Sequence, residues 1–299
     1  MQKGGSSRFH AGNADIEFLD PPPSNSWTIL SIISVVEVAV MQLAHFLPFF
    51  EVTGDGDRSV TRSRSANFGL LSSRRKIIYS AQDTYANVRD QSAVQLEVAM
   101  RSLWDRFFDL FVTGDPSNAG EFAGLEQIVR GAAFEEQILD ARGDVLTAGM
   151  IDHAQQLVGQ GGAFKGVIYT SPRGLAEICW AIRAAGSLPQ ELPVELPGGD
   201  GSPKCVLMTH VNGWLVVPSE SVPAEVFKGK TVTTIWFLKI GPGHLHGIVP
   251  ASTGRNIMIR VRSTNLIEKS AIRYDLTFPA GIAVTEVNDI AVIRNVLVR

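Results

Sequence analysis

Apolar residues between positions 83 and 112 recur at three- and four-residue steps, which is the spacing of one face of an α-helix. The sequence Gly-Asp-Pro at 114–116 follows them and contains residues that end helices. The pattern predicts one long amphipathic helix over 83–112, whose apolar stripe is formed by Leu96, Met100, Leu103, Phe107 and Phe111.

A helix, a short buried strand and a second helix are predicted over 145–186. The apolar run 166–169 is the strand. Ser171 is a good N-cap residue, and Pro172 after it suits the first position of a helix. Gly186 is placed to cap the end of that helix.

The remainder of the chain alternates between apolar and polar residues as β-strands do. Before it, residues 187–204 hold four prolines and three glycines, which predicts an exposed loop. A helical half followed by a β-rich half, without regular alternation, indicates an α+β protein. The candidate strands are 205–209, 213–217, 232–239, 256–262, 271–277, 280–285 and 290–297.

The first 47 residues divide into a polar arm and an apolar segment. Residues 1–25 are rich in Gly, Ser and Asn and end in three prolines, which is typical of a flexible arm. Residues 27–47 are long enough to span a membrane. Their polar residues, however, all fall in one half of a helical wheel, and inserting Glu37 would cost about 2.5–3.5 kcal/mol. The segment is therefore interpreted as a helix that packs on protein and ends before Pro48.

Residues 58–81 predict a long two-stranded hairpin that follows a strand at 49–53 and a turn at 54–57. The hairpin has few apolar residues of its own, so it is expected to lie on another surface. Its positions 58–76 include no acidic residue and six basic ones, namely Arg58, Arg62, Arg64, Arg74, Arg75 and Lys76.

Bulk composition is that of an ordinary globular protein, with 45% hydrophobic and 19% charged residues among 299. The formal net charge of −3 means that no overall basic field attracts nucleic acid or anionic lipid. The two cysteines, Cys179 and Cys205, lack the spacing of a metal site and are expected to be buried free thiols.

No motif predicts a catalytic, cofactor or metal site. His244 and His246 could face one ion, with Asp275 or Glu286 as possible further ligands, but no third ligand lies nearby in the sequence and a glycine-flanked loop is the preferred interpretation. The glycines at 159–162 follow a helix and precede a strand, which is the reverse of a nucleotide-binding loop. The chain is therefore predicted not to be an enzyme, with an unrecognised active site as an alternative.

Several short motifs occur in a characteristic order along the chain. An apolar helix runs into Leu-Pro-Phe at 47–49, and the long helix ends in a phenylalanine-rich run before Phe-Ala-Gly-Leu at 122–125. Further fragments lie at 213–223, 234–241 and 274–293. The order of these motifs resembles the Hong Kong 97 type of tailed-phage major capsid protein over about residues 27–299. Encapsulins, which are cellular nanocompartment shells, share this fold.

The resemblance implies a division of the chain into five parts. These are an N-terminal arm and first helix over 1–47, an extended hairpin called the E-loop over 48–82, a P-domain with the long spine helix and a following sheet over 83–144, an A-domain with a central β-sheet over 145–285, and a C-terminal strand returning to the P-domain over 286–299.

The resemblance also implies a function in the virion. The chain would self-assemble through hexamers and pentamers into an icosahedral capsid in the host cytoplasm. The capsid would enclose double-stranded DNA without reading its sequence, and portal, scaffolding and decoration proteins are possible partners. An encapsulin-type shell is the alternative, and a protein attached to a membrane through 27–47 is a third hypothesis.

A contact between subunits is expected where the E-loop docks on the neighbouring P-domain. Residues 113–144 carry seven acidic residues against two basic ones, opposite in sign to the E-loop. The expected partners of the E-loop cations are the carboxylates of this segment, among them Glu121, Glu126, Glu135 and Glu136.

Overall fold

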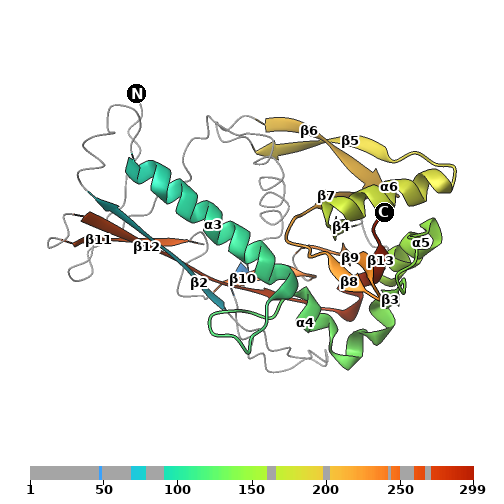
Figure 1. Cartoon of the computed structure of the whole chain (residues 1–299), viewed down its shortest axis with the longest axis horizontal. Helices are drawn as coiled ribbons and strands as arrows, with labels where there is room; N and C mark the ends of the chain where they lie inside the picture. Colours follow the sequence, from blue (N-terminus) through green and yellow to red (C-terminus); the bar gives the residue numbers. More distant parts are fainter. Residues whose placement is uncertain are drawn as a thin grey trace, which may run out of the picture.

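The computed structural model describes residues 47–48, 69–78, 91–159, 166–197, 203–241, 244–249, 259–266 and 271–299. The molecule is elongated, with a long helix lying along a narrow twisted sheet at one end and a wider sheet with two helices at the other (Figure 1). The predicted N-terminal arm, nearly all of the first helix, and the part of the hairpin that holds Arg58, Arg62 and Arg64 lie outside the described residues.

The long helix is α3, Gln91–Thr113, and its predicted apolar stripe faces the core. Leu103, Phe107 and Phe111 are at most 2% exposed. The backbone N–H of Gly114 donates to the carbonyl of Leu110, and the chain then leaves the helix at the predicted point. The helix is therefore confirmed, although the predicted first turns at 83–90 are outside the described residues.

A narrow sheet lies against α3. Its central strand is β12, which pairs antiparallel with β2 on one side and with β11 on the other. β12 also pairs antiparallel with β10, which in turn pairs parallel with the short β1. The strands are β1 (Leu47–Pro48), β2 (Gly69–Ile78), β10 (His246–Val249), β11 (Arg260–Leu266) and β12 (Ala271–Ala283).

Two expectations about this sheet differ from the structure. The strands predicted at 271–277 and 280–285 form one strand, because Leu276, Phe278, Ala280 and Ile282 alternate without a break on the buried face. β2, predicted as one strand of a two-stranded hairpin lying on another surface, pairs along its whole length with β12 of the same chain. The buried side chains of Leu71 and Ile77 account for this attachment.

The second sheet has eight strands, of which seven follow the order β3-β13-β9-β4-β7-β6-β5 and the eighth, β8, pairs with β9. Helices α5 (Ala148–Leu157) and α6 (Pro172–Ala184) pack on one face of it. Ser171 caps α6 as predicted, accepting a hydrogen bond from the N–H of Gly174. The strands are β3 (Ile138–Asp140), β4 (Val167–Thr170), β5 (Gln190–Pro197), β6 (Pro203–Val211), β7 (Trp214–Pro218), β8 (Glu225–Phe227), β9 (Lys230–Leu238) and β13 (Ile290–Leu297).

The prediction of a loop over 187–204 is wrong, because Gln190–Pro197 is a strand that pairs with Pro203–Val211. Proline lacks the N–H that a central strand must donate, but β5 is the edge of its sheet. The hairpin also exposes Cys205, which was expected to be buried, whereas Cys179 on α6 is half-buried.

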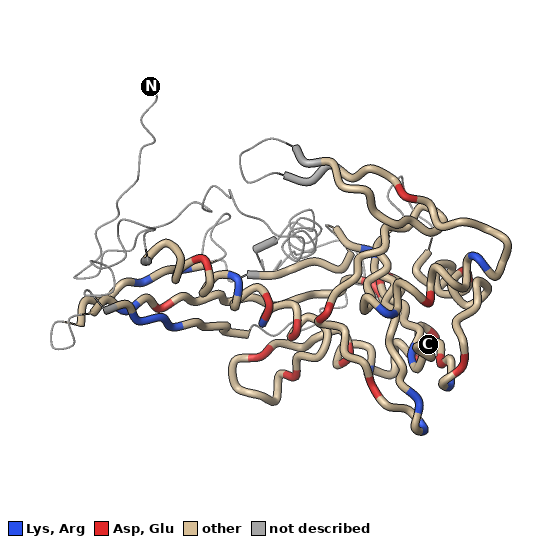
Figure 2. Tube along the Cα trace, turned by 45° about the horizontal axis from the view of Figure 1, so that its top comes forward, with Lys and Arg blue, Asp and Glu red and all other residues tan. Residues whose placement is uncertain are grey.

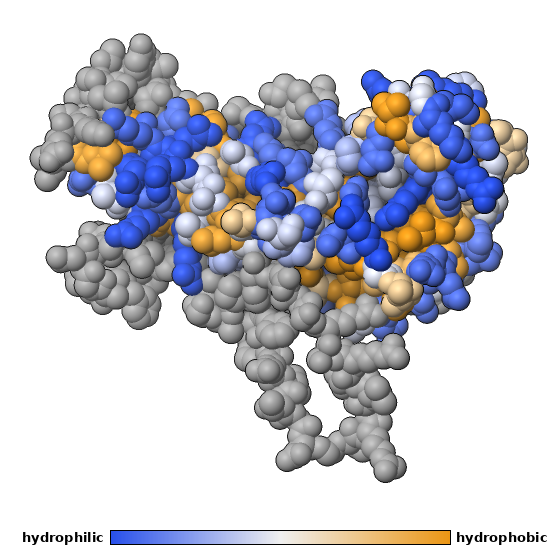
Figure 3. All heavy atoms as spheres, turned by 60° about the horizontal axis from the view of Figure 1, so that its bottom comes forward, coloured by the Kyte–Doolittle hydropathy of each residue, from blue (hydrophilic) through white to orange (hydrophobic). Residues whose placement is uncertain are grey.

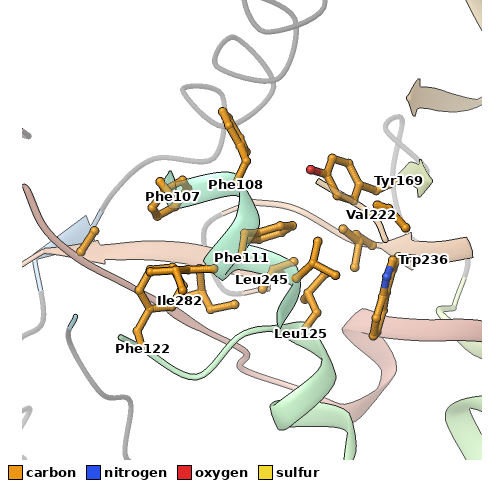
Figure 4. Close-up of a cluster of buried hydrophobic side chains, with 14 of the residues drawn as sticks. Phe107, Phe108, Phe111, Phe122, Leu125, Tyr169, Val222, Trp236, Leu245 and Ile282 are labelled. Atoms are coloured by element: carbon orange, nitrogen blue, oxygen red, sulfur yellow. The ribbon is translucent and has the colours of Figure 1, made fainter. Parts of the chain in front are cut away.

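One aromatic core joins the two sheets (Figure 4). Phe107 and Phe111 of α3 lie between Phe122 on one side and Tyr169 of the second sheet on the other. Trp236 of β9 is completely buried in the same cluster. Because this core is continuous, the long helix is held by both sheets.

The division into sheets differs from the domain boundaries implied by the resemblance. Strands β11 and β12, whose residues were assigned to the A-domain, belong to the sheet beside α3. The C-terminal strand β13 lies between β3 and β9 in the second sheet. The chain passes from the first sheet to the second between the end of β12 at Ala283 and the start of β13 at Ile290. The reason is that β12 buries its apolar face under α3, whereas β13 is buried on both faces.

Candidate inter-subunit surfaces

The turn after α3 places the acidic segment, and two glycines make it possible. The N–H of Gly124 donates to the carbonyl of Gly114 at 2.9 Å. A Cβ at Gly124 would lie 2.5 Å from the carbonyl oxygen of Leu110 and 2.6 Å from the nitrogen of Gly114. Phe122 and Leu125 on either side are completely buried. The segment that follows, α4 (Leu125–Val129) and the short helix η1 (Ala132–Gln137), is therefore fixed to the end of α3.

The predicted acidic residues are not equivalent. Glu121 already pairs with Arg106, its Oε1 lying 2.5 Å from Nη2, and it is largely buried. Burial raises the pKa of Glu126, and the nearby carboxylate of Glu225 raises it further. Glu135 and Glu136 on η1 are both exposed. Of the four predicted acidic residues, Glu135 and Glu136 are the two whose carboxylates are exposed and form no ion pair with another described residue.

The predicted basic residues of β2 fall on opposite faces of the sheet. Arg74 and Lys76 are exposed on the face away from α3. Arg75 is half-buried and opposite Tyr274, on the same face as the buried Leu71 and Ile77. The alternation of side chains along a strand requires this separation. Lys and Arg positions at this end of the molecule are blue in Figure 2.

Sequence reasoning missed three arginines that share the outer face with Arg74 and Lys76. Arg260 and Arg262 on β11 and Arg273 on β12 are brought there by the strand register. The alternation Arg-Val-Arg at 260–262 was a signal for one basic face, but the partner strands could not be read from it. We call these five cations, Arg74, Lys76, Arg260, Arg262 and Arg273, the basic sheet face.

Asp275 is the one acidic side chain at the centre of this face within the described strands. Its Oδ1 lies 2.6 Å from Nε of Arg74, and its Oδ2 lies 2.9 Å from Nε of Arg273. Burial alone would raise the pKa of Asp275, but the two guanidinium groups more than offset this and hold it below the ordinary value. The carboxylate is therefore ionised at neutral pH.

Large apolar side chains are exposed at the other end of the molecule. Trp180 of α6 is 55% exposed, and Leu188, in the turn after α6, is 81% exposed. Leu207 of β6 is 66% exposed. On the face seen in Figure 3, hydrophilic side chains gather over the β2, β11 and β12 end, and hydrophobic patches lie toward the second sheet. Contiguous apolar patches on a surface are typical of sites that contact another protein.

The histidine pair considered as a metal site has separate partners. Nδ1 of His244 lies 2.7 Å from Oδ1 of the buried Asp289, whereas Nδ1 of His246 lies 2.8 Å from the carbonyl oxygen of His244. Asp289 also accepts the N–H of Glu286 and so caps a short helix. Among the described residues, no three His, Cys, Asp or Glu side chains are grouped to hold a metal ion.

Replacing His244 with alanine is expected to destabilise the subunit by about 1–3 kcal/mol, because the buried carboxylate of Asp289 loses a partner. Burial raises the pKa of Asp289, and the Glu286 N–H and His244 lower it. Removing the His244 side chain therefore raises the pKa of Asp289 further. The loss of stability in the variant should become smaller at acidic pH, where the Asp289 carboxyl is protonated. Urea unfolding at neutral and acidic pH measures this.

The matched control is His246→Ala, since His246 bonds only a backbone carbonyl among the described residues. Equal losses of stability in the two variants, or a loss at His244 that does not depend on pH, would contradict the role of Asp289.

No helix among the described residues is long and apolar enough to cross a membrane. Of the segment 27–47, only Leu47 is among the described residues. It lies in β1 and pairs in parallel with Ile248 of β10.

Comparison with known proteins identifies the fold. No protein-family model and no curated protein matches the sequence. Among solved structures, a chain of the holo-SrpI encapsulin complex from Synechococcus elongatus PCC 7942 is 17% identical, with a TM-score of 0.66 and 93% of each chain covered. The capsids of native and empty GTA particles are 13% and 14% identical, each with a TM-score of 0.54, covering 93% of this chain and 95% of theirs. The chain has the Hong Kong 97-type α+β fold that its sequence predicted.

Proposed function

We propose that this chain is the structural subunit of a closed protein shell and not an enzyme. The supporting observation is the shared fold, which covers 93% of the chain in comparison with an encapsulin and with GTA capsids. The exposed Trp180, Leu188 and Leu207 also support it, because they offer apolar surface that a second subunit can cover.

The form of the shell proposed is an icosahedral virion capsid built from hexamers and pentamers, assembled in the host cytoplasm and enclosing double-stranded DNA. Portal, scaffolding and decoration proteins would be its accessory partners. The two ends of the elongated molecule differ in structure, and a contact between two unlike ends is heterologous and can close into a ring.

An encapsulin-type nanocompartment is the second candidate. It is favoured by the TM-score of 0.66 with an encapsulin, against 0.54 with the GTA capsids. The two candidates differ in contents, because a capsid holds nucleic acid whereas an encapsulin encloses protein cargo.

The purified chain is expected to form closed particles, or rings of five and six subunits that convert to them. Light scattering after size exclusion gives the mass, and electron microscopy gives the form. Nuclease-resistant DNA inside the particles supports the capsid, and co-purifying protein without DNA supports the nanocompartment. A chain that stays monomeric across salt and concentration series would contradict both.

A further inference from the structure

The basic sheet face is a regular array of cations. The register places Arg74, Asp275 and Arg262 in one row across the three strands, and Lys76, Arg273 and Thr264 in the next. Rows that share a face repeat about every 6.6–6.8 Å along a strand, and neighbouring strands are about 4.8 Å apart. Five cations with one carboxylate between them thus occupy a small flat area.

Among the described residues, few carboxylates neutralise this array. Arg74 and Arg273 share Asp275, and the side chain of Arg74 remains 71% exposed while doing so. Arg260 and Arg262 are exposed and form no ion pair among the described residues. The opposite face of the same sheet packs against α3, and strand alternation keeps these five cations on the outer face.

The exposed carboxylates of Glu135 and Glu136 lie far from this face. They are on η1, which packs on α4, β3, η4 (Val287–Asp289) and β13, at the end of α3 that joins the second sheet. The basic sheet face is at the other end of the molecule (Figure 1). The two charged surfaces therefore do not meet within one chain, whereas they can meet between two chains.

We propose that the basic sheet face of one subunit docks on the η1 carboxylates, Glu135 and Glu136, of a second copy of this chain. The inference rests on the proposed shell function and names a contact within it. Two different surfaces meet in such a contact, so it is heterologous and can close into rings. Arg75 and Glu121 take no part, because the first lies on the α3 side and the second pairs with Arg106.

A protein partner fits this face better than a nucleic acid backbone. Asp275 carries a negative charge in the central strand, with Arg74 on one side and Arg262 on the other. A continuous line of phosphates crossing the face would pass over that carboxylate and be repelled by it. The two separate carboxylates of η1, Glu135 and Glu136, can instead pair with cations on either side of Asp275.

Arg260→Glu with Arg262→Glu tests the basic side, since within the described strands neither arginine makes an ion pair that the change would break. Assembly at low salt should slow at least tenfold while the thermal unfolding of the subunit is unchanged. Glu135→Arg with Glu136→Arg tests the acidic side and should have the same effect. The matched control is Arg173→Glu with Lys228→Glu, two exposed cations elsewhere, which should assemble like the parent chain.

Complementation gives the sharpest result. Mixing the two non-assembling variants in equal amounts should restore association, because each supplies the charge that the other has lost. Asp275→Asn should act in the opposite direction and raise the salt concentration at which assembly is half lost, since it removes the carboxylate from the basic sheet face. Exposed pairs are screened over about 8–10 Å at physiological ionic strength, so all these effects should fade in high salt.

Each outcome decides the inference separately from the shell function. If the parent chain does not assemble, the shell function itself fails. If the parent assembles and both reversal variants assemble equally well at low salt, this contact is overturned and the shell function stands. Variants that assemble normally but no longer bind added duplex DNA would overturn it in favour of a nucleic acid surface, and folded variants whose mixture fails to associate would also overturn it.

Discussion

Gly124→Ala is expected to destabilise the subunit by roughly 1–3 kcal/mol or more, because the added methyl group meets only backbone atoms. The new Cβ would lie 2.5 Å from the Leu110 carbonyl oxygen, 2.6 Å from the Gly114 nitrogen and 2.8 Å from the Val112 carbonyl oxygen. Backbone at the end of a helix cannot move aside as a flexible side chain can. Urea unfolding of the dissociated subunit measures the loss.

The matched control is Gly149→Ala. Gly149 lies in α5, where a Cβ would meet nothing within 4 Å, and alanine favours a helix over glycine by about 0.5–1 kcal/mol. The control should therefore be neutral or more stable. Comparable losses in both variants would show that the close approach of Gly114 and Gly124 is not what holds the turn. Because this turn carries η1, Gly124→Ala should also weaken assembly.

Trp180→Ala is expected to weaken assembly strongly with little change in subunit stability. The indole is 55% exposed, and its recorded neighbour is the guanidinium of Arg183, 6.0 Å from the ring centroid. A tryptophan buried at the centre of an interface commonly contributes about 2 kcal/mol or more, which corresponds to roughly a thirtyfold change in the association constant. The concentration needed for half-assembly measures this.

Trp180→Phe is the companion variant and should keep most of the assembly, because it retains an aromatic ring on α6. Thermal unfolding of both dissociated variants should match that of the parent chain. A Trp180→Ala protein that assembles at the parent concentration would remove this side chain from the contact between subunits.

Local patterns in the sequence were sufficient for elements whose environment is local. The apolar stripe of α3 predicts which face is buried, since three- and four-residue spacing leaves only one such face. Ser171 and Pro172 predict where α6 begins, because capping involves only neighbouring backbone groups. The motif at 122–125 also resembled the turn that the structure contains, and the overall fold was predicted from such motifs in order.

Long-range pairing decided what these patterns could not. The prolines of β5 predicted a loop, and only its place at the sheet edge, beside β6, makes a strand acceptable there. The charge of Arg74, Arg75 and Lys76 was read as one cluster, but pairing with β12 sends Arg75 to the opposite face.

The basic sheet face itself joins residues from three strands that are as much as about 200 positions apart in sequence. Sequence by itself determined the type of most elements and the sign of their charges, because both depend on neighbouring residues. The tertiary structure alone decided which charges share a surface, because strand register and sheet order arise from contacts between distant segments.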